Sequence, residues 1–321
     1  MSVWGGFQPV PAQAWTAAPV DPFARAYDGL RHHTWYHNLD PTVEETARWL
    51  RGGGRAIDYS GGTGILTERL LPRMPDTAGL LNVDASPKFL RLALEKFGQD
   101  PRCAFRLLEY LPKERRLQTL AECAPGLPRV DGIVCANAIH LYPDVPGTAA
   151  GWHAALRPGG RLHVQSGNIA RGNGADAWVI DATVQAAHDQ AVQLVAGDAR
   201  WKAYRGVLDD PARMAQYAEL RNKYFLPIRP LGQYEAWLRA AGFTVEQVRH
   251  RDVEVRLDEW TQFLSVYHEG VLPWVGGTEK IDGRAPSAQA VQDRQDLLAE
   301  GLRLAVGPSF TAEWTYIDAV A

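Results

Sequence analysis

The chain has 321 residues and a formal net charge of −3, with 46% hydrophobic and 22% charged residues. This length suits one large α/β domain with insertions or two modest domains, and the apolar content is that of a globular protein with a packed core. The charge gives no reason to expect nucleic acid, no run approaches the ~20 apolar residues of a membrane span, and no secretory leader is visible, so we expect a cytoplasmic protein.

Residues 1–22 are rich in Pro, Ala and Gln and show no periodicity, which predicts a flexible or loosely draped arm. A helix is expected over residues 24–30, followed by the polar and aromatic stretch from His32 to His37. A second helix should begin after Asp40, which can cap it, with Pro41 at its first position.

From residue 55 onward, apolar strand patterns alternate with helical patterns. The predicted strands cover residues 55–59, 80–83, 103–108, 132–136 and 161–166, and the predicted helices cover residues 64–71, 87–97 and 149–156. Repeated βα units with short connections favour a doubly wound, mostly parallel α/β sheet. A core domain is therefore expected over residues 23–170, with the first two helices as a cover on its N-terminal side.

The later chain departs from this alternation. Helical patterns cover residues 175–195, 211–223, 232–241, 257–272 and 287–306, and strand patterns cover residues 243–248 and 310–319. Neither of the first two helices is needed to cross between adjacent strands. We therefore expect a helical insertion at 171–230, and the end of the sheet at 231–321 with a second helical cap insertion at 257–308.

The stretch from Asp58 to Gly64 (Asp-Tyr-Ser-Gly-Gly-Thr-Gly) carries the strongest chemical signal. A strand ends in an acid, turns through glycines and opens a helix. The glycines allow a ligand close to the backbone, and the start of the helix offers unpaired N–H groups. The same residues would also serve in a plain strand-to-helix turn.

Asp84 ends the second predicted strand, about 20 residues beyond the glycines. A nucleotide-binding sheet places there the carboxylate that hydrogen-bonds ribose hydroxyls. Asp84 could also cap the helix that begins at Pro87, and the two roles are compatible. The turn Arg157-Pro158-Gly159-Gly160 then leads into the fifth predicted strand.

Together these residues resemble the class I S-adenosylmethionine-dependent methyltransferases over residues 55–167, which implies a seven-stranded Rossmann-like sheet and S-adenosyl-L-methionine as the cofactor. Asp58 to Gly64 is similar to the family's glycine loop, Asp84 to its ribose-binding acid, and Glu109 to the residue that meets adenine. The segment from Asn137 to Leu141 is similar to the one that faces the methionine part. The cofactor-binding residues that the resemblance implies are Asp58, Ser60, Gly61, Gly62, Gly64, Asp84, Ala85, Glu109, Tyr110 and Asn137.

The loop departs from the family pattern at one place, because Ser60 stands where the first glycine is usual. Its hydroxyl could hydrogen-bond the methionine end, or the loop could shift. The same loop does not fit the dinucleotide pattern, since Thr67 stands at the last glycine position of a motif begun at Gly62. An NAD(P)-dependent oxidoreductase and a non-catalytic cofactor-binding module remain the alternatives.

The helical insertions look like the lid of small-molecule methyltransferases such as the trans-aconitate and malonyl-carrier-protein enzymes. This resemblance implies a small-molecule acceptor, methylated on O, N or C, and is compatible with a homodimer. The aromatic residues of the insertions either form the insertions' own core or line a pocket for the acceptor: Trp178, Trp201, Tyr204, Tyr217, Tyr224, Phe225, Trp260, Phe263, Tyr267 and Trp274.

A base would help if the acceptor is a hydroxyl or an acidic carbon, and histidine suits this role near neutral pH. His140 follows the fourth strand at the edge where ligands bind, although it could equally pack or hydrogen-bond in a loop. His33 and Tyr36 are the further candidates, since the segment before the first strand covers the cofactor in related enzymes. We expect no metal site, because no acidic partner is fixed by spacing.

Overall fold

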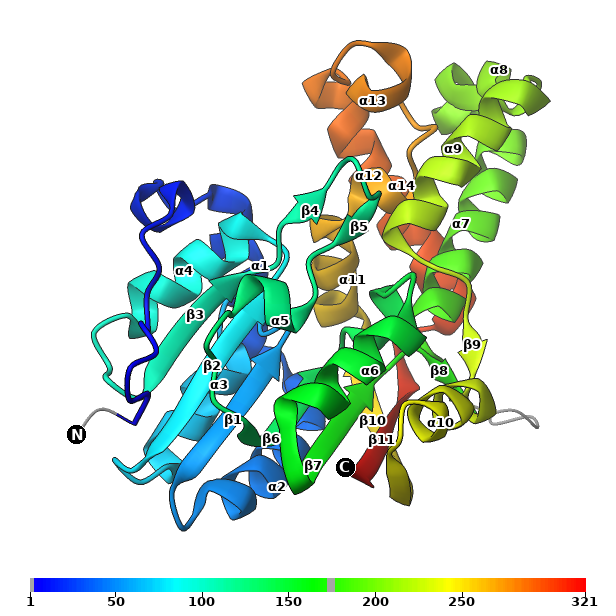
Figure 1. Ribbon diagram of the computed structural model, residues 1–321. Coiled ribbons are helices and arrows are strands. Elements are labelled where there is room, and N and C mark those ends of the chain that lie inside the picture. The colour runs from blue at the N-terminus through cyan, green and yellow to red at the C-terminus, as the bar shows by residue number, and fades with distance from the viewer. Residues whose placement is uncertain (1–2, 172–176) are drawn as a thin grey trace.

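The computed structural model describes residues 3–171 and 177–321, and its centre is one seven-stranded sheet. The strand order is β10-β11-β7-β6-β1-β2-β3, and β11 alone runs antiparallel to its neighbours. The doubly wound, mostly parallel sheet is thus confirmed (Figure 1). The strands are β1 (Gly54–Tyr59), β2 (Ala78–Asp84), β3 (Cys103–Leu107), β6 (Val130–Ala136), β7 (Leu156–Ser166), β10 (Thr244–Arg256) and β11 (Ser309–Val320).

Strand β1 lies at the centre of the parallel part and sets the position of the site. Its Asp58 pairs in register with Asn82 of β2 on one side and with Val134 of β6 on the other. The carboxyl ends of these three strands therefore lie at the same edge of the sheet. The strand order reverses between β1 and β6, with β2 and β3 following on one side and β7 on the other. Ligands of open α/β sheets bind at such a point.

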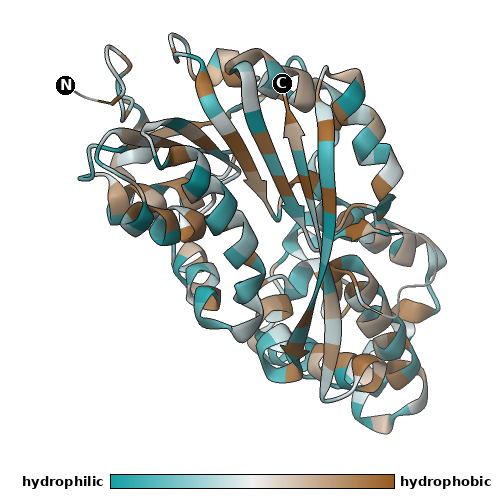
Figure 2. Ribbon diagram, turned by 90° about the horizontal axis from the view of Figure 1, so that it is seen from below, coloured by the Kyte–Doolittle hydropathy of each residue, from teal (hydrophilic) through white to brown (hydrophobic). Residues whose placement is uncertain are grey.

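The sheet is buried on both faces, which explains its continuous apolar runs. Ala56 and Leu80 pack into the hydrophobic cluster on one face, whereas the adjacent Ile57 and Leu81 pack into the cluster on the other. Figure 2 shows hydrophobic stretches along the strands. The helices of this part are α1 (Pro22–Gly29), α2 (Asp40–Leu50), α3 (Ile65–Leu70), α4 (Pro87–Phe97), α5 (Leu120–Cys123), α6 (Val145–Ala155) and α10 (Leu231–Ala240).

The remaining α-helices gather beyond the carboxyl ends of the parallel strands (Figure 1). Helices α7 and α14 pack closely along each other, since a Cβ on Gly301 of α14 would lie 2.7 Å from the carbonyl oxygen of Ala187 in α7. We call this group the helical cap. It consists of α7 (Ile180–Gly197), α8 (Arg205–Leu208), α9 (Pro211–Tyr224), α11 (Leu257–Val266), α12 (His268–Val271), α13 (Glu279–Asp282) and α14 (Ala288–Val306).

Short elements complete the described chain. They are the 3₁₀ helices η1 (Ala14–Ala17), η2 (Leu30–His32), η3 (Thr34–Leu39), η4 (Leu71–Arg73), η5 (Ile139–Leu141) and η6 (Ala199–Tyr204), the hairpin β4 (Tyr110–Leu111) with β5 (Arg116–Leu117), and the pair β8 (Ile169–Ala170) with β9 (Arg229–Pro230). Within residues 3–171 and 177–321, no helix has the length and apolar character needed to cross a membrane.

The N-terminal segment differs from the flexible arm expected for residues 1–22. Its described part packs against the outer edge of the sheet, where Trp4, Phe7 and Trp15 are buried. The carbonyl oxygen of Pro9 accepts a hydrogen bond of 2.9 Å from the backbone N–H of Phe105 in β3. The three aromatic side chains hold the segment in place, although its sequence has no periodicity.

Several boundaries also differ from the sequence-based expectation. Helix α7 begins at Ile180, and the start expected at residue 175 lies outside the described residues. The helix expected over residues 257–272 is two helices, because the backbone leaves the helical conformation at Tyr267. Strand β10 runs on to Arg256 because β11 pairs with it up to that residue. Asp40 lies inside α2 rather than capping it, and its carboxylate pairs with Arg69.

Candidate functional site

The glycine loop joins β1 to α3 and is held by backbone hydrogen bonds. The N–H groups of Ser60 and Gly61 both donate to the carbonyl oxygen of Val83, at 2.7 and 3.2 Å. Ser60, at the usual position of the first glycine, adopts the left-handed conformation with a φ of 63°. This costs a non-glycine residue on the order of 1 kcal/mol. Its hydroxyl is 2.5 Å from the Tyr142 hydroxyl, which offsets part of this cost.

Two glycines of the loop are needed for opposite reasons. A Cβ on Gly61 would lie 2.7 Å from the Asp58 carboxylate and 2.8 Å from the Asn82 amide, so the protein itself fills that space. A Cβ on Gly62 would meet no atom within 4 Å, and its φ is 57°. Residues with a side chain rarely adopt this backbone conformation, and the space beside Gly62 is open. Both properties suit a ligand that passes along the loop.

Two buried carboxylates flank this space. Asp84 accepts hydrogen bonds from the N–H groups of Gly62 and Ser86, at 2.8 and 2.7 Å, and Asp58 accepts one of 3.2 Å from the Thr67 hydroxyl. Burial raises the pKa of Asp58 to about 7 and that of Asp84 to about 6. Within the described ranges, neither carboxylate forms an ion pair. A ligand with positive charge and hydroxyl groups would therefore compensate both.

Asp58 and the glycine loop line a pocket with an empty volume of about 400 Å³, which we call the loop pocket. Asp84 is not among its lining residues and is linked to it through the Gly62 N–H. The far side of the loop pocket is formed by the side chains of Tyr27, Tyr36 and Asn137. Asn137 follows β6 with a φ of 56°, and its side-chain oxygen accepts a hydrogen bond of 2.9 Å from the Trp314 indole. The open space at Gly62 and the unpaired carboxylates fit S-adenosylmethionine, which is a hydroxylated cation.

A second cavity of about 690 Å³ adjoins the first, and we call it the aromatic pocket. The two pockets share Tyr27, Tyr36 and Asn137, so these residues stand between them. The other lining residues come from both the sheet side and the cap: Trp35, His140, Leu141, Ile180, Asp181, Tyr224, Phe225, Phe263, Tyr267 and Trp314. The remaining cap aromatics named in the sequence analysis do not line it.

His140 lies in η5 and lines the aromatic pocket while being 8% exposed. Its Nδ1 is 2.9 Å from the Ser166 hydroxyl, and no hydrogen bond within the described part of the chain engages its Nε2. Burial, helped by the charge of Arg229, lowers the pKa of His140 to about 4, so the ring is neutral at pH 7. A neutral imidazole can accept a proton.

Tyr36 separates the two pockets and has no basic character. Its hydroxyl hydrogen-bonds with that of Tyr27, and burial raises the pKa of Tyr36 far above its ordinary value. It therefore stays a phenol that donates hydrogen bonds. The catalytic role considered for Tyr36 from the sequence stays a prediction.

Four further residues singled out from the sequence are not brought to these pockets. Both ring nitrogens of His33 are engaged, by the Gln262 amide at 3.0 Å and the Trp35 indole at 3.2 Å, and His33 lines only a separate surface hollow. Glu109 and Tyr110 are exposed because the chain turns into the β4–β5 hairpin there. Ala85 is also exposed, directly after Asp84, and does not line the loop pocket.

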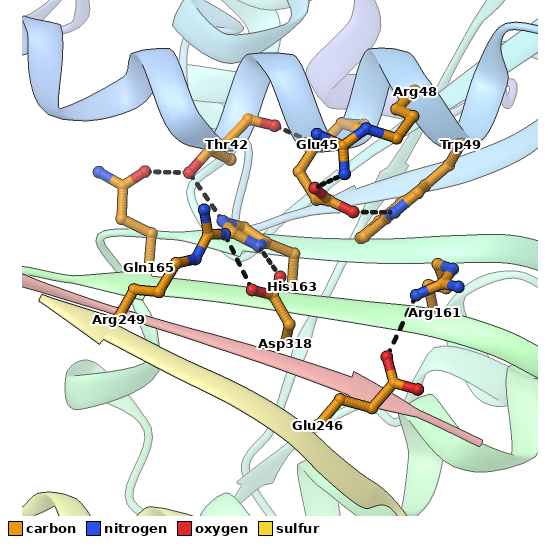
Figure 3. Close-up of polar contacts among 11 residues, drawn as sticks. Thr42, Glu45, Arg48, Trp49, Arg161, His163, Gln165, Glu246, Arg249 and Asp318 are labelled. Carbon is orange, nitrogen blue, oxygen red and sulfur yellow. Dashed lines mark hydrogen bonds and ion pairs between the residues drawn. The ribbon is translucent and has the colours of Figure 1, made fainter.

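A buried polar network fixes α2 to the last strands of the sheet (Figure 3). The Thr42 hydroxyl is 3.0 Å from Nε2 of His163, whose Nδ1 is 2.6 Å from the Asp318 carboxylate, and Arg249 donates to the same carboxylate at 2.8 Å. Thr42 also donates to Gln165. Thr42 and His163 are fully buried, and neither lines a pocket described above, so this hydroxyl–imidazole–carboxylate arrangement is structural.

The same network positions the segment that carries Tyr36. The Gln165 amide donates to the Asn38 side chain at 2.8 Å, and the Tyr316 hydroxyl donates to the Asn38 carbonyl oxygen at 2.7 Å. Element η3 is thereby tied to β7 and β11. Asn38 and Gln165 could not be predicted as partners from the sequence, since nothing in the local pattern indicates that the two meet.

Comparisons with known proteins agree with this geometry. The family described as "Methyltransferase domain" matches residues 57–162, which include the glycine loop and Asp84. No curated protein matches the sequence.

Among solved structures, the chain is similar to the YcgJ protein from Bacillus subtilis, with 15% identity and a TM-score of 0.50 over 89% of this chain and 98% of that one. It also resembles an S-adenosylmethionine-dependent methyltransferase from Thiobacillus denitrificans, described in complex with S-adenosyl-L-homocysteine, with 14% identity and a TM-score of 0.49 over 95% of this chain and 100% of that one. At such identities the structural likeness to YcgJ shows the fold alone. The family match places a methyltransferase domain over residues 57–162 of this chain.

Proposed function

We propose that the protein transfers a methyl group from S-adenosylmethionine to a small-molecule acceptor held in the aromatic pocket beneath the helical cap. One observation carries the proposal: the loop pocket and the aromatic pocket share Tyr27, Tyr36 and Asn137. A cofactor held at the loop would therefore present its methyl group to a second, mostly apolar cavity. A cavity of about 690 Å³ suits a small molecule.

The cofactor supplies an activated methyl group on a sulfonium, an excellent leaving group. On the protein side, Asp84 is placed to hold ribose hydroxyls, and Asp58 to face the cationic part of the ligand. The open backbone at Gly62 admits the ligand chain. Tyr27, Tyr36 and Asn137 then border the acceptor and limit its approach to one direction, which is the main contribution a protein makes to such a displacement.

His140 is the group we assign to proton removal when the acceptor loses a proton. The hydroxyl of Ser166 can donate to or accept from Nδ1, so the ring can present either an N–H or a lone pair at Nε2. With Nδ1–H facing Ser166, the lone pair of Nε2 is available to the acceptor. The aromatic walls exclude water from the reacting atoms.

The test has two measurements on the purified protein. Calorimetry should show binding of S-adenosylmethionine and of its demethylated product, and no binding of NAD(P). Incubation with methyl-labelled cofactor and a pool of small metabolites should then label an acceptor and release S-adenosylhomocysteine. Tight binding with no label transferred to any pool would instead favour the non-catalytic binding module.

A further inference from the structure

The aromatic pocket contains one carboxylate that the proposed reaction does not use. Asp181 lies in the first turn of α7 and lines this pocket. Among the lining residues, all within the described part of the chain, it is the only one that can carry a negative charge near neutral pH, and no Lys or Arg accompanies it. The pocket is therefore electrostatically suited to a neutral or positively charged acceptor and disfavours an anionic one.

The buried carboxylate of Asp181 has neither an ion-pair partner nor a full set of hydrogen bonds within the described residues. Its Oδ2 is buried without a hydrogen-bond partner, and no ion pair within the described ranges includes it. Burial raises the pKa of Asp181 to about 6, against the smaller opposite effects of the neighbouring Asn168 amide and the Arg221 charge. A buried oxygen that accepts no hydrogen bond lowers the stability of the fold unless a ligand donates one to it.

One short segment positions both polar ends of the pocket. The Ser166 hydroxyl is 2.9 Å from Nδ1 of His140 and accepts a hydrogen bond of 3.0 Å from the N–H of Asn168. The side-chain oxygen of Asn168 in turn accepts a hydrogen bond of 2.9 Å from the N–H of Asp181. His140 and Asp181 are thus fixed relative to each other through the residues that follow β7.

Asp181 also stands at a junction. Together with Phe225 it lines an outer groove of about 1000 Å³ between α7 and the end of α9 with the chain that follows, and Arg221 of α9 lines the same groove. A group bound at Asp181 would therefore sit at the neck between the aromatic pocket and the surface. The rest of the acceptor would fill the aromatic pocket, with aromatic faces around the charge.

We propose that Asp181 binds an ammonium group of the acceptor, so that the protein methylates an aromatic or apolar amine rather than an acid or a neutral molecule. This inference rests on the proposed function, because it assigns the aromatic pocket to the acceptor. Asp181 is here a specificity-determining residue: it holds the acceptor, and His140 serves the reacting atom.

Three probes with one ring and one linker length test the inference. Binding of tryptamine, tryptophol and indole-3-propionate is measured by calorimetry in the presence of saturating S-adenosylhomocysteine. Tryptamine should bind about tenfold more tightly than either of the others, as a charge-assisted hydrogen bond predicts. Asp181→Asn should reduce this preference to about twofold. Asp189→Asn is the matched control, since it removes a carboxylate of the same helix that lines the outer groove alone, and it should keep the preference.

The outcomes separate the inference from the function on which it rests. If wild-type protein does not bind S-adenosylhomocysteine, both the proposed function and the amine assignment are overturned. Wild-type protein that binds it, yet holds tryptamine no more tightly than indole-3-propionate, overturns only the amine assignment, and this comparison requires no variant. A preference that survives in Asp181→Asn overturns the role of Asp181. Because Asp181 also lies in the first turn of a helix, unchanged affinity for S-adenosylhomocysteine is the check that the variant is folded.

Discussion

The two pockets of this protein are built in different ways. The loop pocket takes its loop and the Asp58 carboxylate from one continuous stretch, residues 58–66, and Asp84 at the end of the neighbouring parallel strand holds that loop through Gly62. The aromatic pocket is assembled from residues as distant as Tyr27 and Trp314, contributed by the N-terminal cover, the cap and the last strand. A binding site made from neighbouring strand ends can be read from a sequence, whereas one made from distant elements becomes visible only after folding.

The largest effect is expected from Gly62→Val, which tests the loop pocket directly. The side chain would occupy the open space beside the loop and force a β-branched residue to a φ of 57°. Binding of S-adenosylhomocysteine, measured by calorimetry, should be lost, while circular dichroism should still report a folded chain. Gly126→Val is the matched control, since Gly126 also has a positive φ and open surroundings but lies before β6. Normal binding by Gly62→Val would show that the ligand does not pass along this loop.

A smaller effect, confined to turnover, is expected from a change in the aromatic pocket. His140→Ala should lower the rate of methyl transfer roughly 10²- to 10⁴-fold, the usual contribution of a positioned base, and leave cofactor affinity nearly unchanged. His33→Ala, which changes a histidine outside both pockets, should keep the wild-type rate. The measurement is single-turnover transfer of labelled methyl to the acceptor that the pool experiment identifies. Equal rates for both variants would place the base elsewhere or make it unnecessary.

Asp84→Ala should weaken cofactor binding by about 1–3 kcal/mol, because the carboxylate would no longer hold hydroxyl groups in a buried place. It would also release the N–H groups of Gly62 and Ser86. Asp100→Ala removes a partly buried carboxylate that pairs with Arg102 in the loop before β3, at the amino end of that strand, and should change affinity little. Titration calorimetry compares the two variants, and matching affinities would remove Asp84 from the site.

The mildest test changes no residue. Burial gives Asp58 a pKa of about 7 and Asp84 a pKa of about 6, so both are largely protonated below pH 6 and must lose a proton to meet a cationic ligand. Cofactor affinity should therefore rise with pH, roughly tenfold between pH 6 and pH 8, and then level off. Asp58→Asn should remove the increase in cofactor affinity that occurs near pH 7, because Asp58 is the group that titrates there. A flat profile in the wild type would mean that neither carboxyl titrates on binding.

The sequence was sufficient for the parallel strands and the loop because their signals are local. The run over β6 is continuously apolar because the sheet is covered on both faces, and Asp58, Gly62 and Asp84 follow strand ends directly. Glu109 was placed at the site by resemblance, yet the chain turns into the β4–β5 hairpin at that point. No pattern within a few residues encodes that turn away from the pocket.

For the aromatic pocket, the sequence predicted that some aromatic residues of the insertions could line it, but not which ones. Tyr224, Phe225, Phe263 and Tyr267 line it, whereas Trp201 and Trp260 belong to the core, and spacing along a helix cannot separate the two groups. Trp314 was not predicted to line the pocket, because it lies in a strand, where a buried tryptophan is ordinary. Asp181 carries no signal at all in the sequence, since an acid in the first turn of a helix is common.

The buried contacts of Thr42 and Asn38 with the end of the chain have a consequence for biosynthesis. Strand β11 is synthesised after the other strands of the sheet, yet it inserts between β7 and β10, and Tyr316 and Asp318 on it take part in fastening η3 and α2. Until that strand is in place, the segment carrying Tyr36 lacks these anchors. A nascent chain can thus complete its glycine loop early, but it can close the wall between the two pockets only after β11 has been synthesised.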